Sequence, residues 1–527
     1  MSASPRPTRF PRLRRMARLL PVLPLGLALL TAPAAAQLAP PPPPPLTGVV
    51  TLNPKLLLQL VVRRSAEVGY SRAQIDVAAE LSKAEEALYE AVYYASARRE
   101  GGPRQRTVEE RIASLATAKL NVLDELNKSV DTGIKVRLPT GGDLSLSYRL
   151  RERRNNLIAS GSPSDTEYDG AMVVAFRQPL LKGFGRAVTE TDLRVARIEQ
   201  RIAMLQYQQQ LLKTGNDALT LYWQLFRALE VRDIRRQALD YGRRVAADTG
   251  ARIDAGKLAA SNNIEAKAAV LLREVELMRA EQGVREAEGK LETTLSISGL
   301  ADSKLTLAVS GGPDLTDAQL GTAAQRFERA LDSWPALGIA SLRAEQAGIR
   351  LDYARNQKLP TLDLVLGRTN SGLATDNRIA RDLAEQGRYP AWSIGLNLEI
   401  PVEGNQKARA QYRAQNARVQ QAEIEIGSIR TALANEVRTR WEQAIGGRDE
   451  VARMKEDVAL RTELLRIERV RYDSGISQLT QLLQRENELT ESRQRLVESN
   501  ARRGAANDAL LFADGSLLSH YDITLKD

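Results

Sequence analysis

Four short segments in which apolar and polar side chains alternate constrain the fold of this chain more than any other feature. A period of two is typical of a β-strand with one apolar face. The segments form two pairs, and the second member of each pair ends at a proline, Pro179 or Pro401. The alternating segments are residues 143–150, 172–177, 361–367 and 392–400. The sequence therefore predicts two β-hairpins, over 138–179 and 361–401.

Long helical patterns follow both hairpins. Apolar residues spaced by seven recur in each, which is the spacing of a narrow coiled-coil seam. They are Ile198, Leu205, Leu212, Leu219 and Phe226 in the first, and Leu482, Leu489 and Leu496 in the second. Each pattern is interrupted once by an Asp-x-Gly sequence, so we expect two long helical hairpins, over 180–300 and 402–512.

The two halves of the chain repeat the same order of features. Arg252 to Gly256 match Arg471 to Gly475 with an offset of 219. Leu144 and Leu362 differ by 218, and the two prolines that end the hairpins differ by 222. Landmarks in one order at nearly one offset predict an internal two-fold repeat.

The first residues are typical of an exported protein. Residues 1–36 contain six arginines and no acid, and all six arginines precede an apolar run from Leu19 to Leu30 that is followed by Ala34-Ala35-Ala36. We interpret 1–36 as a cleaved signal peptide. The alternative is a membrane anchor, but the run is shorter than the ~20 residues that a spanning helix needs. A proline-rich spacer, 37–53, comes next.

The remaining segments complete the predicted organisation. Residues 54–137 look helical, with a break at Gly101-Gly102-Pro103. Short helices and a connector are expected over 301–360, and a C-terminal tail over 513–527.

Composition excludes several functions. Outside residues 1–36 the net charge falls from +10 to +4, and no basic stripe remains that would indicate nucleic-acid binding. The chain has no cysteine and a single histidine, His520, so thiolate metal sites and common catalytic triads lack their residues. We therefore expect no enzymatic activity, cofactor or bound metal.

Four strands of this length suit an outer membrane, because tilted spanning strands need ~9–11 residues. The alternative is a small antiparallel sheet packed on helices, which needs one apolar face as well. Four strands cannot close a barrel, and open edges cannot face lipid. Three copies would supply twelve strands around a lumen, so we predict a homotrimer with four strands per protomer.

At this point the chain resembles the TolC-type outer-membrane efflux protein family. The resemblance covers about residues 54–512 and is carried by the repeat, by the strand–proline–helix junctions at 176–186 and 400–408, and by the Asp-x-Gly breaks. It implies an α+β fold of mostly long helices, with a trimeric 12-stranded transmembrane β-barrel continued by a periplasmic α-helical barrel. The chain departs from some members by lacking a lipidated cysteine and by having the proline run.

The resemblance also implies where the functional residues lie. In the family, two helix–helix turns form the periplasmic tip, where the pore closes and an adaptor docks. The matching residues are Arg252, Asp254, Gly256, Arg471, Tyr472, Asp473 and Gly475. The alternative for Asp254 and Asp473 is that they only start or cap helices. Pro179 and Pro401 are interpreted as strand-to-helix junctions, because proline cannot donate in a sheet ladder.

The predicted function is an outer-membrane channel of a tripartite efflux or type I secretion system. Its partners would be two further copies, a periplasmic adaptor, an inner-membrane pump and outer-membrane lipid, with a large periplasmic part. A periplasmic adaptor protein is the main alternative, although it normally has one helical hairpin rather than two repeated units. An exported enzyme is the other, and the fragment Gly183-Phe184-Gly185 is too slight for a nucleotide site.

Overall fold

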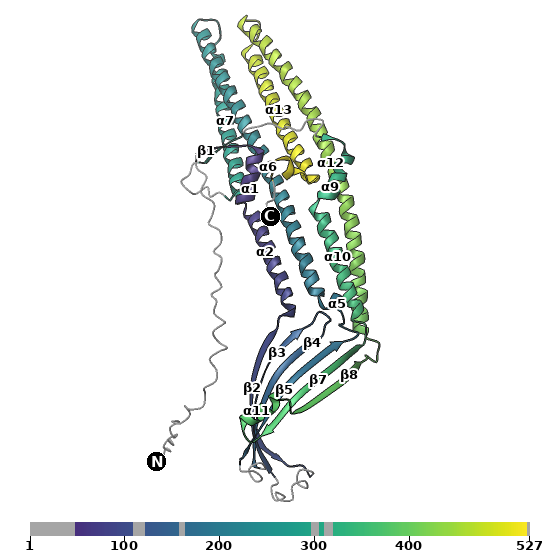
Figure 1. The fold of residues 1–527 in the computed structure, drawn as a ribbon. Coiled ribbons are helices and arrows are strands. Elements are labelled where there is room, and N and C mark those ends of the chain that lie inside the picture. Colours follow the sequence, from purple (N-terminus) through teal and green to yellow (C-terminus); the bar gives the residue numbers. More distant parts are fainter. Residues whose placement is uncertain (1–47, 109–121, 157–163, 297–304, 310–319, 524–527) are drawn as a thin grey trace, which may run out of the picture. The chain divides into compact units, whose positions relative to one another are not determined.

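A computed structural model describes residues 48–108, 122–156, 164–296, 305–309 and 320–523. The chain divides into two units, 1–44 and 45–527, and every described residue belongs to the second. The predicted signal peptide and most of the predicted spacer lie outside the described residues. Long helices and an antiparallel sheet make up the second unit, which is therefore an α+β structure (Figure 1). No helix in the described part combines the length and apolar character needed to cross a membrane.

The main sheet has six strands, and all neighbouring strands are antiparallel (Figure 1). Their order in the sheet is β2 (Val92–Gln105), β3 (Val122–Arg137), β4 (Asp143–Asn155), β5 (Thr166–Pro179), β7 (Thr361–Ala374) and β8 (Tyr389–Glu399). A second, small parallel sheet pairs β1 (Gly48–Leu52) with β6 (Leu305–Val309). The hairpins β4–β5 and β7–β8 occupy the segments for which the alternating pattern predicts them.

Two expectations from the sequence are wrong here. Among the described residues of 54–137, the run of helices ends at Tyr89 and the strands β2 and β3 follow, so the sheet has six strands per chain instead of four. The sequence Gly101-Gly102-Pro103 lies inside β2, where it pairs with residues 124–126, and does not form a turn between helices. The physical reason is that pairing with β3 stabilises an extended segment whose own alternation is weak.

The register of the six strands sorts their side chains into two faces. Facing partners lie on the same face of a sheet, and alternate residues of a strand lie on opposite faces. One face carries the apolar residues Tyr93, Val130, Ile134, Val136, Leu144, Leu146, Leu150, Val174, Phe176, Leu364, Leu366, Ile394, Leu396 and Leu398. The other face carries mainly small, polar and charged residues, including Ser96, Asp131, Ser145, Ser147, Arg177, Asp363, Ser393 and Asn397. We call these the apolar face and the polar face.

Two long helical hairpins make up most of the helical part. The first consists of α6 (Thr191–Asp254) and α7 (Ser261–Thr294), and the second of α12 (Gln406–Asp473) and α13 (Leu479–Ala513). At ~1.5 Å per residue, the 64 residues of α6 span about 96 Å. The two hairpins lie side by side through α6 and α13 (Figure 1). The apolar residues at seven-residue spacing are buried or half-buried, as a seam between helices requires.

Shorter helices pack along these hairpins. The helices α1 (Pro54–Arg64) and α2 (Ala66–Glu86) lie against α6, α9 (Ala323–Ser333) lies against α12, and α10 (Pro335–Asn356) contacts both α6 and α12. The remaining elements are η1 (Ala87–Tyr89), α5 (Arg186–Thr189), α11 (Asn377–Glu385), which covers parts of β5 and β7, and α14 (Leu517–His520).

A buried contact between Trp223 of α6 and Gly504 of α13 fixes how closely the two hairpins approach. A Cβ at Gly504 would lie 2.4 Å from the Trp223 ring, so a glycine is required there. The indole Nε1 of Trp223 donates to Asp508 Oδ2 at 2.7 Å, and the Tyr521 hydroxyl donates to Asp508 Oδ1 at 2.7 Å. Trp223 belongs to the largest apolar core among the described residues.

Asp508 predicts a pH dependence of stability. Desolvation raises the pKa of this buried carboxyl from 3.8 to about 6, although its hydrogen bonds to Trp223 and Tyr521 act in the opposite direction. The raised pKa favours folding below about pH 4, and this contribution disappears as the pH rises through about 6. The change amounts to about 3 kcal/mol, because one pKa unit corresponds to about 1.4 kcal/mol.

We therefore expect the Asp508→Asn variant to gain stability relative to the native chain as the pH rises from 4 to 7. Asparagine keeps a carbonyl acceptor and cannot ionise. The measurement is the difference in unfolding midpoint between the two proteins in detergent, at several pH values. A difference that does not change with pH would contradict the assignment.

Candidate functional site

The candidate site consists of two helix turns that have the same backbone structure. At the first, Gly256 donates to the Ile253 carbonyl at 2.8 Å and Lys257 donates to the Arg252 carbonyl at 2.9 Å. At the second, Gly475 donates to the Tyr472 carbonyl at 3.0 Å and Ile476 donates to the Arg471 carbonyl at 2.9 Å. This pair of bonds is the Schellman motif, which ends a helix by satisfying its last carbonyls.

Glycine is required at the same position of both turns. Gly256 has φ +71° and Gly475 has φ +75°, a left-handed conformation that is strained for other residues. The two Asp-x-Gly sequences therefore end their helices with the same backbone geometry.

A cluster of charged side chains joins the two turns within one chain. Arg252 donates to Asp473 Oδ1 at 2.7 Å and forms an ion pair with Asp248 Oδ2 at 3.0 Å. Asp473 also accepts from Arg469 at 3.3 Å. We call Asp248, Arg252, Arg469 and Asp473 the tip cluster. Because Arg252 lies in the last turn of α6 and Asp473 ends α12, the cluster connects the two long helical hairpins.

The tip cluster also packs against an aromatic ring. The Arg252 guanidinium lies 4.9 Å from the centre of the Tyr472 ring, a cation–π geometry. Tyr472 is buried, and its hydroxyl lies 3.4 Å from Thr249 Oγ1. Around it, Val245, Ala266, Leu479 and Leu482 form a small apolar core. The guanidinium of Arg252 is therefore held in place by packing as well as by charge.

The structure separates the predicted residues into two groups. Arg252, Tyr472 and Asp473 meet in one place, whereas the Asp254 side chain is exposed and makes no ion pair or hydrogen bond within the described part of the chain. Arg471 pairs with Glu468 on its own helix, at 3.4 Å. Neither aspartate caps the start of a helix, because Asp254 and Asp473 are the last residues of α6 and α12. The capping alternative is therefore wrong.

The sequence reasoning missed two members of the tip cluster. Asp248 and Arg469 lie four residues from Arg252 and Asp473, the spacing at which side chains on a helix meet. This spacing is visible in the sequence and could have identified both. A buried pair farther from the turns, Arg273 of α7 with Glu486 of α13, was also missed.

The two prolines lie where the sheet meets the helices. Pro179 is the last residue of β5, and Pro401 follows the end of β8 and precedes α12. After Pro179, the Gly183 backbone donates to Asn356 Oδ1 at 2.7 Å, at the end of α10. After Pro401, Asn405 Nδ2 donates to the Gln357 carbonyl at 3.1 Å. Both junctions are therefore bonded to the same short segment that leads from α10 to β7.

Charged groups gather on the polar face at this end of the sheet. Arg177 donates to Asp363 at 2.7–2.9 Å, and Asp143 faces Arg177 across the β4–β5 ladder. Together with Glu399 they line a cavity of about 510 Å³ at the junction. The register places Asp143, Arg177 and Glu399 together on the polar face.

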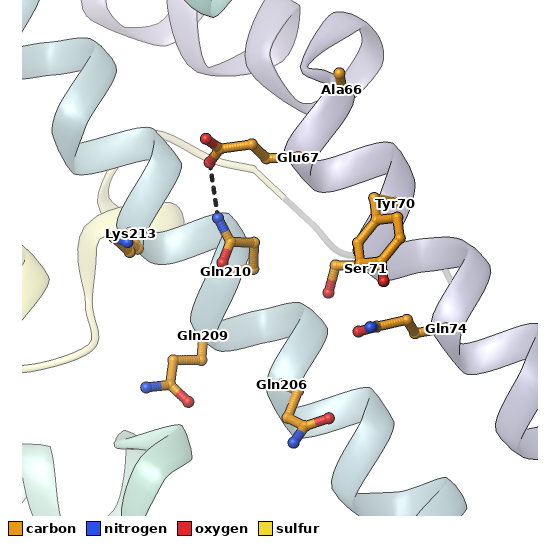
Figure 2. Close-up of a pocket in the computed structure, with 9 residues that line it drawn as sticks. All are labelled: Ala66, Glu67, Tyr70, Ser71, Gln74, Gln206, Gln209, Gln210 and Lys213. Carbon is orange, nitrogen blue, oxygen red and sulfur yellow. Dashed lines mark hydrogen bonds between the residues drawn. The ribbon is translucent and has the colours of Figure 1, made fainter.

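A second hollow, a groove of about 880 Å³, lies between α2 and α6 (Figure 2). Its polar lining includes Glu67, Lys213 and several glutamines, and Gln210 donates to Glu67 at 2.9 Å. Amide side chains neither activate a nucleophile nor transfer protons at neutral pH. The described residues also contain no group of three or more His, Cys, Asp or Glu that could hold a metal ion.

Comparison with known proteins shows which proteins this chain is similar to. Residues 327–516 match the family model described as outer membrane efflux protein. The outer membrane efflux protein BepC of Brucella suis is 24% identical over 395 residues, which are 73% of this chain and 81% of BepC. The outer membrane channel CmeC of Campylobacter jejuni has the same fold at 12% identity, with a TM-score of 0.63, over 88% of this chain and 86% of CmeC. A membrane protein from Pseudomonas aeruginosa matches with a TM-score of 0.64 and 16% identity, over 88% of this chain and 91% of that protein.

Fold and comparisons together define a channel protein of the outer membrane, in which an antiparallel sheet is joined to long helical hairpins. The predicted resemblance to TolC-type outer-membrane efflux proteins is confirmed by the family match and by these structural neighbours. Proteins of this family are channels and not enzymes. The comparisons do not support the alternative of a periplasmic adaptor.

Proposed function

We propose that this protein is the exit duct of a tripartite efflux or type I secretion system. In this role it would passively conduct substrates that an inner-membrane pump and a periplasmic adaptor deliver. The observation that carries the proposal is the apolar face of the six-stranded sheet, where Ile134, Leu146, Ile394 and Leu396 are each 47–65% exposed. An exposed apolar area of this kind marks a surface that is covered in the working protein.

Lipid is the occupant that fits this surface best. The apolar face continues from β3 to β8, and β2 adds Tyr93 to it, whereas the opposite face is polar enough for a wet lumen. The sheet is open in a single chain, and unpaired strand edges are not stable in lipid. A closed wall therefore requires several copies, and the family resemblance favours a homotrimer.

The helices would extend the duct away from the membrane into the periplasm. Both long hairpins leave the same end of the sheet, next to Pro179 and Pro401 (Figure 1). We infer that these prolines end the strands and allow the change of direction between barrel and helices. Three copies of the paired hairpins would form the periplasmic helical barrel.

The tip cluster lies at the far ends of the hairpins, where such a duct would be closed at rest. We infer that Arg252 and Asp473 hold neighbouring helix ends together, and that the turns at Gly256 and Gly475 form the surface on which an adaptor docks. Exposed ion pairs of this type stabilise a conformation by only ~0–1 kcal/mol each, so docking of a partner can break them.

A conductance measurement tests the proposed function. The protein is extracted from outer membranes, purified and inserted into planar lipid bilayers. We expect stable oligomers that produce discrete current steps. A water-soluble monomer that produces no current would refute the proposal.

A further inference from the structure

One hairpin of the sheet is inserted into only one half of the chain. In the second half, α10 ends at Asn356 and β7 begins at Thr361, so four residues separate the two elements. In the first half, α2 ends at Glu86 and β4 begins at Asp143, so 56 residues separate the two elements. These residues contain β2 and β3. The strand count of the chain therefore depends on this insertion.

The inserted hairpin is a full part of the sheet. β3 pairs with β4 over 13 consecutive residues, from Glu125–Asn155 to Arg137–Asp143. Lys128 and Glu152 form an ion pair across this ladder at 2.6 Å, and Arg149 and Asp131 form another at 3.2 Å. The two pairs lie on opposite faces, so the hairpin is bonded to β4 from both sides.

The hairpin also continues both faces of the sheet. On the apolar face, Val130, Ile134 and Val136 of β3 lie opposite Leu150, Leu146 and Leu144 of β4. Val130 and Ile134 are each 48% exposed. On the polar face, β2 presents Ser96 and Arg98, and β3 presents Asp131. A hairpin that served only as a cover for the sheet would not need to maintain this alternation.

The free edges of the sheet are consequently β2 and β8, and β4 is not an edge. Every residue of β8 is exposed, and so is nearly every residue of β2. Because six antiparallel strands alternate in direction, β2 and β8 run in opposite directions. They can therefore form a further antiparallel pair between copies, which keeps the even strand number of bacterial outer-membrane barrels.

Building on the proposed function, we propose that β2 of one copy pairs with β8 of the next copy, so that each copy contributes six strands to the wall. Three copies then close a barrel of 18 strands instead of 12. Barrel diameter increases roughly linearly with strand number, so this barrel is about 1.5 times as wide. Barrels of 16–18 strands contain an aqueous channel. The membrane part of the duct therefore admits bulkier cargo than a twelve-stranded barrel does.

Engineered cysteines test the subunit contact. The native chain contains no cysteine, so every disulfide that forms must come from the introduced residues. Ser96→Cys on β2 is combined in turn with Ser393→Cys, Gly395→Cys or Asn397→Cys on β8. All four positions lie on the polar face, and three positions on β8 allow for the unknown register. The matched control combines Ser147→Cys of β4 with the same β8 cysteines, which is the contact expected if four strands form the wall.

We expect oxidation to link at least one Ser96→Cys combination into covalent trimers on denaturing gels, while the Ser147→Cys combinations stay monomeric. Links from Ser147→Cys and none from Ser96→Cys would overturn the proposal while leaving the proposed channel function intact. Absence of both oligomers and current in the native chain would instead refute the channel function itself.

A deletion provides a second readout, of barrel width. Removing residues 91–140 leaves a connection from α2 to β4 about as short as that from α10 to β7. We expect the largest polymer that enters the channel from the strand side to decrease in diameter by about one third. An unchanged size limit would contradict the proposal, and if the deletion prevents assembly, the cysteine pairs still decide the question.

Discussion

Replacing Arg273 by methionine is expected to destabilise the protein by about 3–5 kcal/mol. Arg273 of α7 and Glu486 of α13 are both almost fully buried and form an ion pair. Arg273 also donates to Asn487 Oδ1 at 3.1 Å and to the Ala269 carbonyl at 3.0 Å. Without the guanidinium, the Glu486 carboxylate stays buried, and among the described residues only the Thr490 hydroxyl donates to it, at 3.1 Å. The measurement is the free energy of unfolding in detergent.

Two further variants distinguish a buried charge from a general loss of contacts. The double change Arg273→Met with Glu486→Leu removes both charges and should recover most of the lost stability. Arg243→Met breaks the exposed pair between α6 and α7, Arg243 with Glu274 at 2.8 Å, and should cost at most about 1 kcal/mol. A double variant as unstable as the single one would show that packing of the arginine stem, and not its charge, is what matters.

The pair of Arg273 and Glu486 lies between the two helical hairpins of the duct. Arg273 and Glu486 join the first helical hairpin to the second, and a Cβ at the neighbouring Gly242 would lie 3.0 Å from the Arg273 side chain. The hairpins are thus tied together firmly by a buried pair, whereas the tip cluster joins them through exposed groups. Relative movement of the two hairpins should therefore be easiest at their ends.

Much of this fold could be predicted because the strands repeat a simple period. The strands β4, β5, β7 and β8 alternate large apolar and polar side chains, and prolines mark the ends of β5 and β8. β2 could not be recognised in this way, since small and charged residues such as Ala95, Ala97 and Arg99 stand where large apolar ones would be expected. β3 does alternate, from Val130 to Val136, but a turn inferred from Gly101-Gly102-Pro103 suggested helices on both sides.

The candidate site could be predicted only in part, for a similar reason. The two turns have local signatures, because a glycine with positive φ ends each helix. The contact between Arg252 and Asp473 joins residues 221 positions apart, and no local pattern reveals which helices lie side by side. Arg252 pairs with Asp473 and not with the nearby Asp254, because lateral packing of α6 and α13 brings Asp473 within reach.

Reversing the charge at Asp473 should open the duct. In Asp473→Arg, a third arginine would lie beside Arg252 and Arg469, so the attraction that joins the helix ends becomes repulsion. Each lost pair is worth about 0.5–1 kcal/mol at this exposure, and a trimer loses three of them. The combined 1.5–3 kcal/mol corresponds to a roughly 10- to 150-fold increase in the ratio of open to closed channels. Open probability in planar bilayers is the quantity to measure.

The control for this experiment is present in the chain itself. Asp254 ends α6 as Asp473 ends α12, but it is exposed and has no charged partner within the described residues, so Asp254→Arg should leave the open probability nearly unchanged. Asp473→Asn removes the attraction without adding repulsion and should fall between the native chain and Asp473→Arg. High salt screens exposed charges and should bring the native chain closer to Asp473→Asn. Equal effects at Asp254 and Asp473 would mean that net charge at the tip controls opening, and that the contact between Arg252 and Asp473 does not.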